Sequence, residues 1–166
     1  MALLLNDPSA LRFYTDIRAI FAALEPLPQR LDWLVTDLEC NPLNGAPLPT
    51  ELAGSDAQAL TGEAFLRAVT EADLQFIWGV LSGFEPGTAP DPAALSVNER
   101  PYADGNPAFW TGCPAIQHPE AEIEIVCWDS CLSILLSRDP AVESRFRSAF
   151  PSAVDLETFN AARAAP

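Results

Sequence analysis

The chain has 166 residues, 49% of them apolar, and it carries 23 acidic residues against nine arginines and no lysine. This length and apolar content fit one folded domain with its own core, so we expect residues 1–166 to form a single domain with the net charge of −14 on its surface. The charge argues against nucleic acid or an acidic membrane as a partner, and it favours basic proteins.

No apolar run approaches the roughly 20 residues that a membrane span needs, and residues 1–5 lack the basic start of a signal peptide. We therefore expect a cytoplasmic protein with free thiols. The chain has one histidine, His118, and no cysteine pair at metal-binding spacing, so neither a metal nor another cofactor is expected.

The first half of the chain predicts two helices and two strands. Apolar spacing predicts a helix from residue 8 to about residue 24, and residues 31–38 (LDWLVTDL) predict a strand. After a Pro-rich loop over 40–60, Thr61 is a plausible N-cap for a helix over 62–72. Residues 74–84 (LQFIWGVLSGF) predict a central strand that is buried on both faces.

Residues 85–119 predict a long Pro-rich loop, since seven of the 16 prolines lie there without helical or strand periodicity. A loop of this length is often functional. Tyr102, Phe109, Trp110 and Ile116 interrupt it. We expect these apolar side chains to pin the loop to the domain or to a partner.

Residues 122–137 (EIEIVCWDSCLSILLS) predict a β-hairpin. A three-residue loop at 128–130 would place glutamates opposite apolar residues, whereas a two-residue turn at Asp129-Ser130 gives one apolar and one polar face. We predict the second register, because a one-residue slip moves every side chain to the other face. Its apolar pairs are Ile123 with Leu136, Ile125 with Ile134, and Cys127 with Leu132.

Asp139-Pro140 then predicts the start of a helix to about residue 150, and a short helix follows from residue 155. The order of the elements predicts an α+β fold. We expect a mixed or antiparallel sheet of about four strands, covered by helices, with the long Pro-rich loop beside it.

Three groups of residues raise the question of catalysis. Cys113 and His118 are the nearest thiol–imidazole pair, but both lie in the loop without a nucleophile motif. Cys127 and Cys131 are predicted to point to opposite faces of the hairpin, Cys127 inward, so we expect no ligand or redox pair. Carboxylates also bracket the first strand, and a charged strand end explains them better than a reaction. They are Asp32, Asp37 and Glu39. We therefore assign no catalytic residue.

The alternating Glu120, Glu122 and Glu124 are expected to project from one face of a strand. Three interpretations stay open: a solvated face, a docking strip for basic residues of a partner, or a cation or acid–base site. Trp110 in the loop, and Trp128 with Asp129 at the hairpin end, are candidate interface anchors.

The segments DWLVTDLECN (32–41), FIWGVLSGF (76–84) and EIEIVCWDSCLSILLS (122–137), followed by a helix, resemble in layout a group of small acidic bacterial α+β proteins. Many of these are immunity proteins of toxin systems that act between bacteria. The resemblance implies an antitoxin that binds and blocks one cognate toxin in the cytoplasm, and it transfers no binding residue.

We therefore expect a non-enzymatic immunity-type protein that occludes the active site of a basic toxin. The expected contact residues are Glu120, Glu122, Glu124, Trp110, Trp128 and Asp129. One alternative is a small carboxylate-based or metal-assisted enzyme with a cleft under the 85–119 loop. Another is an adaptor or structural subunit. Neither the toxin nor the oligomeric state follows from the sequence.

Overall fold

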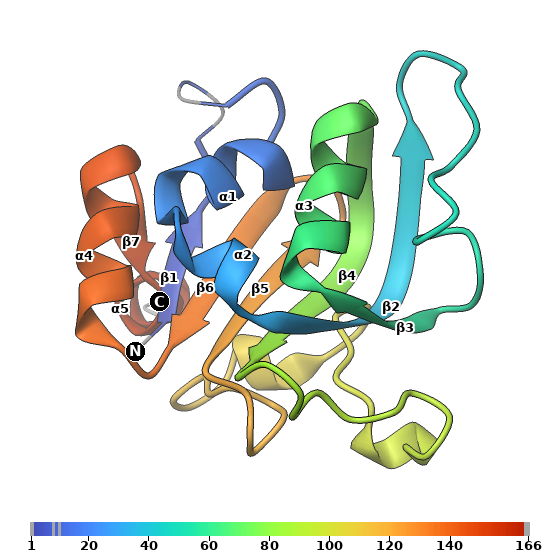
Figure 1. The fold of residues 1–166 in the computed structure, drawn as a ribbon. Helices are drawn as coiled ribbons and strands as arrows, with labels where there is room; N and C mark the ends of the chain where they lie inside the picture. Colours follow the sequence, from blue (N-terminus) through green and yellow to red (C-terminus); the bar gives the residue numbers. More distant parts are fainter. Residues whose placement is uncertain (1, 8, 10, 165–166) are drawn as a thin grey trace.

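A computed structural model describes residues 2–7, 9 and 11–164, and within them all strands join one antiparallel sheet (Figure 1). The order is β3-β2-β4-β5-β6-β1-β7. The strands are β1 (Ala2–Leu5), β2 (Asp32–Pro42), β3 (Ala57–Thr61), β4 (Leu74–Phe84), β5 (Ile123–Trp128), β6 (Leu132–Ser137) and β7 (Val154–Asp155). The α+β class is confirmed, but the expected number of about four strands is wrong, because the described sheet has seven.

The missed strands, β1, β3 and β7, carry weak local signals. β1 (ALLL) is buried along its whole length and so shows no alternation of polar and apolar residues. Four of the five residues of β3 lie in the stretch over 40–60 that was predicted as a loop, and β7 has two residues. Each of the three strands is specified by its pairing with a distant segment more than by its own residues.

The helices are α1 (Ile17–Leu24), α2 (Leu27–Arg30), α3 (Gly62–Glu71), α4 (Pro140–Ala149) and α5 (Leu156–Ala164). The helix predicted from residue 8 begins only at Ile17, where Asp16 caps it by accepting from the Ala19 amide; Pro8 itself lies outside the described residues. Thr61 caps α3 and Asp139 caps α4, as predicted. None of the helices in the described part is long and apolar enough to cross a membrane.

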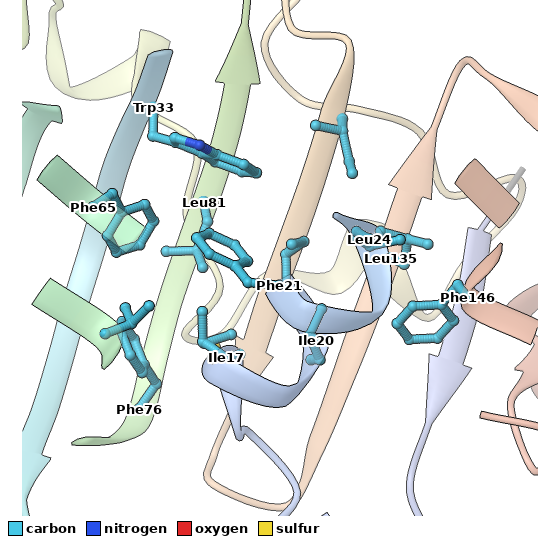
Figure 2. Packing of buried hydrophobic residues seen from close by; sticks show 14 of the residues in the cluster. Ile17, Ile20, Phe21, Leu24, Trp33, Phe65, Phe76, Leu81, Leu135 and Phe146 are labelled. Carbon is cyan, nitrogen blue, oxygen red and sulfur yellow. The ribbon is translucent and has the colours of Figure 1, made fainter. Parts of the chain in front are cut away.

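Helices α1 to α4 cover one face of the sheet, called here the helix side. Figure 1 shows α1, α3 and α4 stacked on this face. Figure 2 shows the core between them, where the ring of Phe21 lies 5.0 Å from that of Trp33 and 5.2 Å from that of Phe65. The sheet is closely packed at Gly83 as well: a Cβ atom there would lie 2.7 Å from a methyl group of Ile123.

The other face, called the loop side, is covered by the segment 85–122 and by α5. The segment contains two short 3-10 helices, Val97–Glu99 and Pro107–Phe109. A second apolar cluster lies beneath it, including Val80, Phe109 and Val126. Both faces of the central strands are therefore buried, as predicted for residues 74–84.

The β5–β6 hairpin turns at the predicted residues but has a different register. Asp129 and Ser130 have φ values of 47° and 54°, which suit a primed turn, and Cys131 is one further loop residue. Trp128 therefore pairs with Leu132. The observed partners of Ile123, Ile125 and Cys127 are Ser137, Leu135 and Ser133. The predicted register is wrong because it assumed that one face of the hairpin meets solvent. Both faces are buried, so the pattern of polar and apolar residues does not decide between the registers.

Candidate functional site

The segment 85–122 is tied to the sheet by carboxylates that accept hydrogen bonds from its backbone amides. Asp32 binds the amide of Gly87 (2.7 Å), Asp37 those of Ala103 and Asp104 (2.7 and 2.8 Å), and Glu124 those of Gln117 and His118 (2.8 and 3.0 Å). The attachments are spread over the start, the middle and the end of the segment. They make it a fixed surface of the domain.

Asp37 occupies the irregular part of β2, where the register with β4 shifts. Its φ of 51° lies in the left-handed region, which aspartate tolerates better than most residues. The bulge turns its carboxylate toward the loop, and the neighbouring Thr36 hydroxyl donates to the Pro101 carbonyl at 2.7 Å. This anchoring role was not predicted, because nothing in the sequence separates Asp37 from the other carboxylates of the strand, Asp32 and Glu39.

Glu124 is fully buried, so the predicted strip of three exposed glutamates is wrong at this position. Besides the two loop amides, the Ser82 hydroxyl donates to it at 3.1 Å. Burial raises the pKa of Glu124, and the hydrogen bonds that it accepts act in the opposite direction. A carboxylate held in this way supports the loop from inside and does not face a partner.

Glu120 and Glu122 precede β5 and are exposed. The Glu120 amide donates to Nδ1 of His118 at 3.3 Å, and the Glu122 amide donates to the Gly83 carbonyl at 2.8 Å. The backbone under both residues is thus fixed while their carboxylates reach solvent.

Four aromatic rings gather at the hairpin end on the loop side, and we call them the aromatic cluster: Trp78, Phe109, Trp110 and Trp128. The ring of Trp128 lies 4.8 Å from that of Trp110 and 5.1 Å from that of Trp78, edge to face in both cases. Trp110 and Trp128 are half-buried and border a cleft of about 450 Å³. Asp129 is exposed directly beside them. The cluster presents aromatic surface that is held in place by its own packing.

The aromatic cluster and the two exposed glutamates lie at opposite ends of β5. Trp128 lies six positions after Glu122, which at about 3.3 Å per residue is roughly 20 Å. The structure therefore does not bring the predicted contact residues to one point. A protein interface of about 800 Å² per partner is roughly 30 Å across, so one protein partner can reach both ends.

Charge is distributed unequally over the two sides. Helices α1 to α4 carry five arginines against three glutamates. The segment 85–122 carries six exposed carboxylates against one arginine, Arg100. The six are Glu85, Asp91, Glu99, Asp104, Glu120 and Glu122. The segment 85–122 therefore contributes a net charge of −5 and the four helices +2, so the loop segment is the more acidic of these two parts.

The remaining candidate residues lie apart or are engaged. Cys113 is exposed, whereas His118 packs edge to face against Phe84 at 4.9 Å. Cys127 is buried and Cys131 exposed, as predicted. Across residues 2–7, 9 and 11–164, no three Cys, His, Asp or Glu side chains gather closely enough to hold a metal ion.

No protein-family model, no curated protein and no solved structure matches this chain.

Proposed function

We propose that the protein is an immunity-type inhibitor, acting in the cytoplasm, that binds a basic toxin protein through its loop side and occludes the toxin's active site. The observation that carries the proposal is the charge asymmetry between the acidic segment 85–122 and the arginine-rich helices. Nuclease toxins are commonly basic because they must approach phosphates. An asymmetric acidic protein is drawn to such a surface and oriented with its loop side first.

The aromatic cluster supplies the second part of the proposed contact. Interface residues that dominate binding energy are commonly tryptophan, tyrosine or arginine in well-packed surroundings. Trp110 and Trp128 have such surroundings, and Asp129 adds a carboxylate beside them. In this arrangement the exposed carboxylates set the association rate and the tryptophans set the lifetime of the complex.

The experiment begins with capture of partners on the tagged protein in its source organism, at low and at moderate salt. Each captured protein is then expressed alone and together with this chain. The proposal expects one basic protein that arrests growth alone and permits growth in the presence of this chain. Capture without that rescue would contradict the proposal.

Charge reversal then tests the surface. Glu120→Arg with Glu122→Arg should lower the association rate constant about tenfold at low salt and reduce its salt dependence. The matched control reverses Glu63 and Glu71, which are exposed on α3 of the helix side, and should have a much smaller effect. Equal effects of the two double variants would refute the assignment of the loop side.

A further inference from the structure

The outer edge of β3 is an unpaired strand edge, because β3 pairs with β2 alone (Figure 1). The Ala57 amide donates to Oγ of Ser55 at 3.3 Å, so the backbone of Ala57 points away from β2. Alternate residues of an antiparallel strand direct their backbone groups to the same side, so the N–H and C=O of Ala59 also point outward. Within the described part of the chain, no backbone hydrogen bond reaches Ala59 from that side.

Two hollows run along this edge. A cleft of about 670 Å³ is lined by residues 57–60 of β3 and by Asp91, Pro92 and Ala93 of the loop. A second hollow of about 220 Å³ is lined by residues 59–61 together with Gly87 and Ala89. Every residue of β3 borders one of the two hollows, so the loop lies beside the edge without covering it.

The larger cleft also contains two buried polar atoms without a hydrogen-bond partner, Oε1 of Gln58 and Nε of Arg100. One is an acceptor and the other a donor. Both side chains are partly exposed, and each is held by another hydrogen bond: Nε2 of Gln58 donates to the Ser55 carbonyl at 2.8 Å, and the Arg100 guanidinium donates to the Pro92 carbonyl at 3.2 Å. An inorganic anion would satisfy Arg100 alone. A peptide backbone offers an N–H and a C=O in alternation, which suits Gln58, Arg100 and the edge at Ala59 together.

We propose that the β3 edge binds an extended segment of a basic partner protein, which adds to the sheet as an eighth strand. Three carboxylates, Glu51, Asp56 and Asp91, line the cleft. Arg67 pairs with Glu51 at 3.0 Å and Arg100 with Asp56 at 3.6 Å, so the rim keeps one net negative charge, which favours a basic segment. The net charge of −14 repels a second copy of this chain. The basic nature of the partner rests on the proposed function, whereas the strand edge and the unpartnered atoms stand independently.

The test uses an eight-residue peptide of alternating valine and lysine with blocked ends, added to the complete protein. Binding should have a dissociation constant on the order of 0.1 to 1 mM and should slow amide exchange at Ala59 and Thr61 severalfold. Two control peptides should not bind: one with N-methyl groups on alternate residues, which cannot pair, and one with glutamate in place of lysine. Equal binding of the N-methylated peptide, or no slowing at Ala59, would overturn the proposal.

A variant provides a second, independent readout. Ala59→Pro removes the outward N–H, and an edge strand tolerates proline at such a position; Ala59→Val keeps the N–H. Peptide binding should fall at least tenfold in the proline variant alone. If Ala59→Pro does not fold, the N-methylated peptide decides. If amide exchange at Ala59 slows as the protein concentration rises in the absence of peptide, the occupant of the edge is a second copy of the chain. That result would overturn the proposal.

The outcome is separable from that of the proposed function. If the Ala59→Pro variant neutralises a toxic partner as well as the natural chain does, the inhibitor proposal stands and the β3 edge plays no part in it. If the peptide binds at β3 but no toxic partner is found, the β3 proposal stands and the inhibitor proposal fails.

Discussion

Replacing Asp37 with alanine should release the middle of the segment 85–122 from the bulge in β2. The lost hydrogen bonds run from the amides of Ala103 and Asp104 to one carboxylate oxygen, at 2.7 and 2.8 Å. Ala103 is fully buried, so its N–H stays unpaired, whereas the exposed Asp104 amide regains water. Hydrogen bonds to a charged group contribute about 1.5–3 kcal/mol each, so we expect a loss of about 2–4 kcal/mol in the free energy of unfolding.

Asp37→Asn separates the hydrogen bonds from the charge. Both amides donate to the same oxygen, Oδ2, so the carbonyl of asparagine can accept both, and asparagine also tolerates the positive φ of 51°. This variant should lose about 1 kcal/mol, measured by urea unfolding with tryptophan fluorescence. Glu39→Ala, exposed in the same strand, is the control and should change the free energy by less than about 0.5 kcal/mol. An alanine variant at position 37 as stable as this control would refute the reasoning.

Three further substitutions test other parts of the fold. Gly62→Ala should lower the free energy of unfolding in urea by at least about 2 kcal/mol, because its Cβ would overlap the Pro28 carbonyl oxygen; a variant as stable as the natural protein would contradict this close approach. Glu124→Gln places an NH₂ group where a carboxylate oxygen accepts a loop amide, and should cost about 1–3 kcal/mol at neutral pH; no loss would mean that the loop does not depend on that oxygen. Burial lowers the pKa of His118, so the imidazole takes up its proton at a higher pH in the unfolded chain than in the folded chain. The free energy of unfolding therefore decreases as the pH falls from 6.5 toward the folded pKa. His118→Asn keeps an acceptor for the Glu120 amide and should flatten that slope in urea midpoints measured over the range; an unchanged slope would assign it to other groups.

The helices α3 and α4 could be predicted from the sequence because their signals are local. Thr61 and Asp139 cap them, and apolar spacing marks the buried face. The start of α1 could not be placed, since the apolar pattern extends over residues that form turns before Asp16. The hairpin register depended on which face meets solvent, and that is decided by the segment 85–122, whose position is fixed by contacts from distant strands.

The same dependence explains the outcome for the candidate site. The alternation of Glu120, Glu122 and Glu124 predicted one strand, but Glu120 lies in a turn and Glu122 in a bend. Only Glu124 lies within β5, under the amides of Gln117 and His118. No local feature separates it from its two neighbours. The tryptophans at 110 and 128 were singled out by their positions in a loop and at a hairpin end, and the structure places them side by side.

The way in which the loop is anchored has a consequence for its charge. Backbone amides satisfy Asp32, Asp37 and Glu124, and Arg138, which donates to the Pro119 carbonyl, adds a cation close to Glu124. The six exposed carboxylates of the loop outnumber Arg100 and Arg138 together. Like charges held together repel one another, and salt screens that repulsion over about 10 Å at 0.1 M. Raising sodium chloride from about 0.05 to about 0.5 M should therefore raise the melting temperature of the free protein while it lowers the association rate with a basic partner. A melting temperature that falls as salt is added would show that attractive ion pairs dominate this surface. The loop side would then lack the uncompensated negative charge on which the proposed encounter with a basic partner depends.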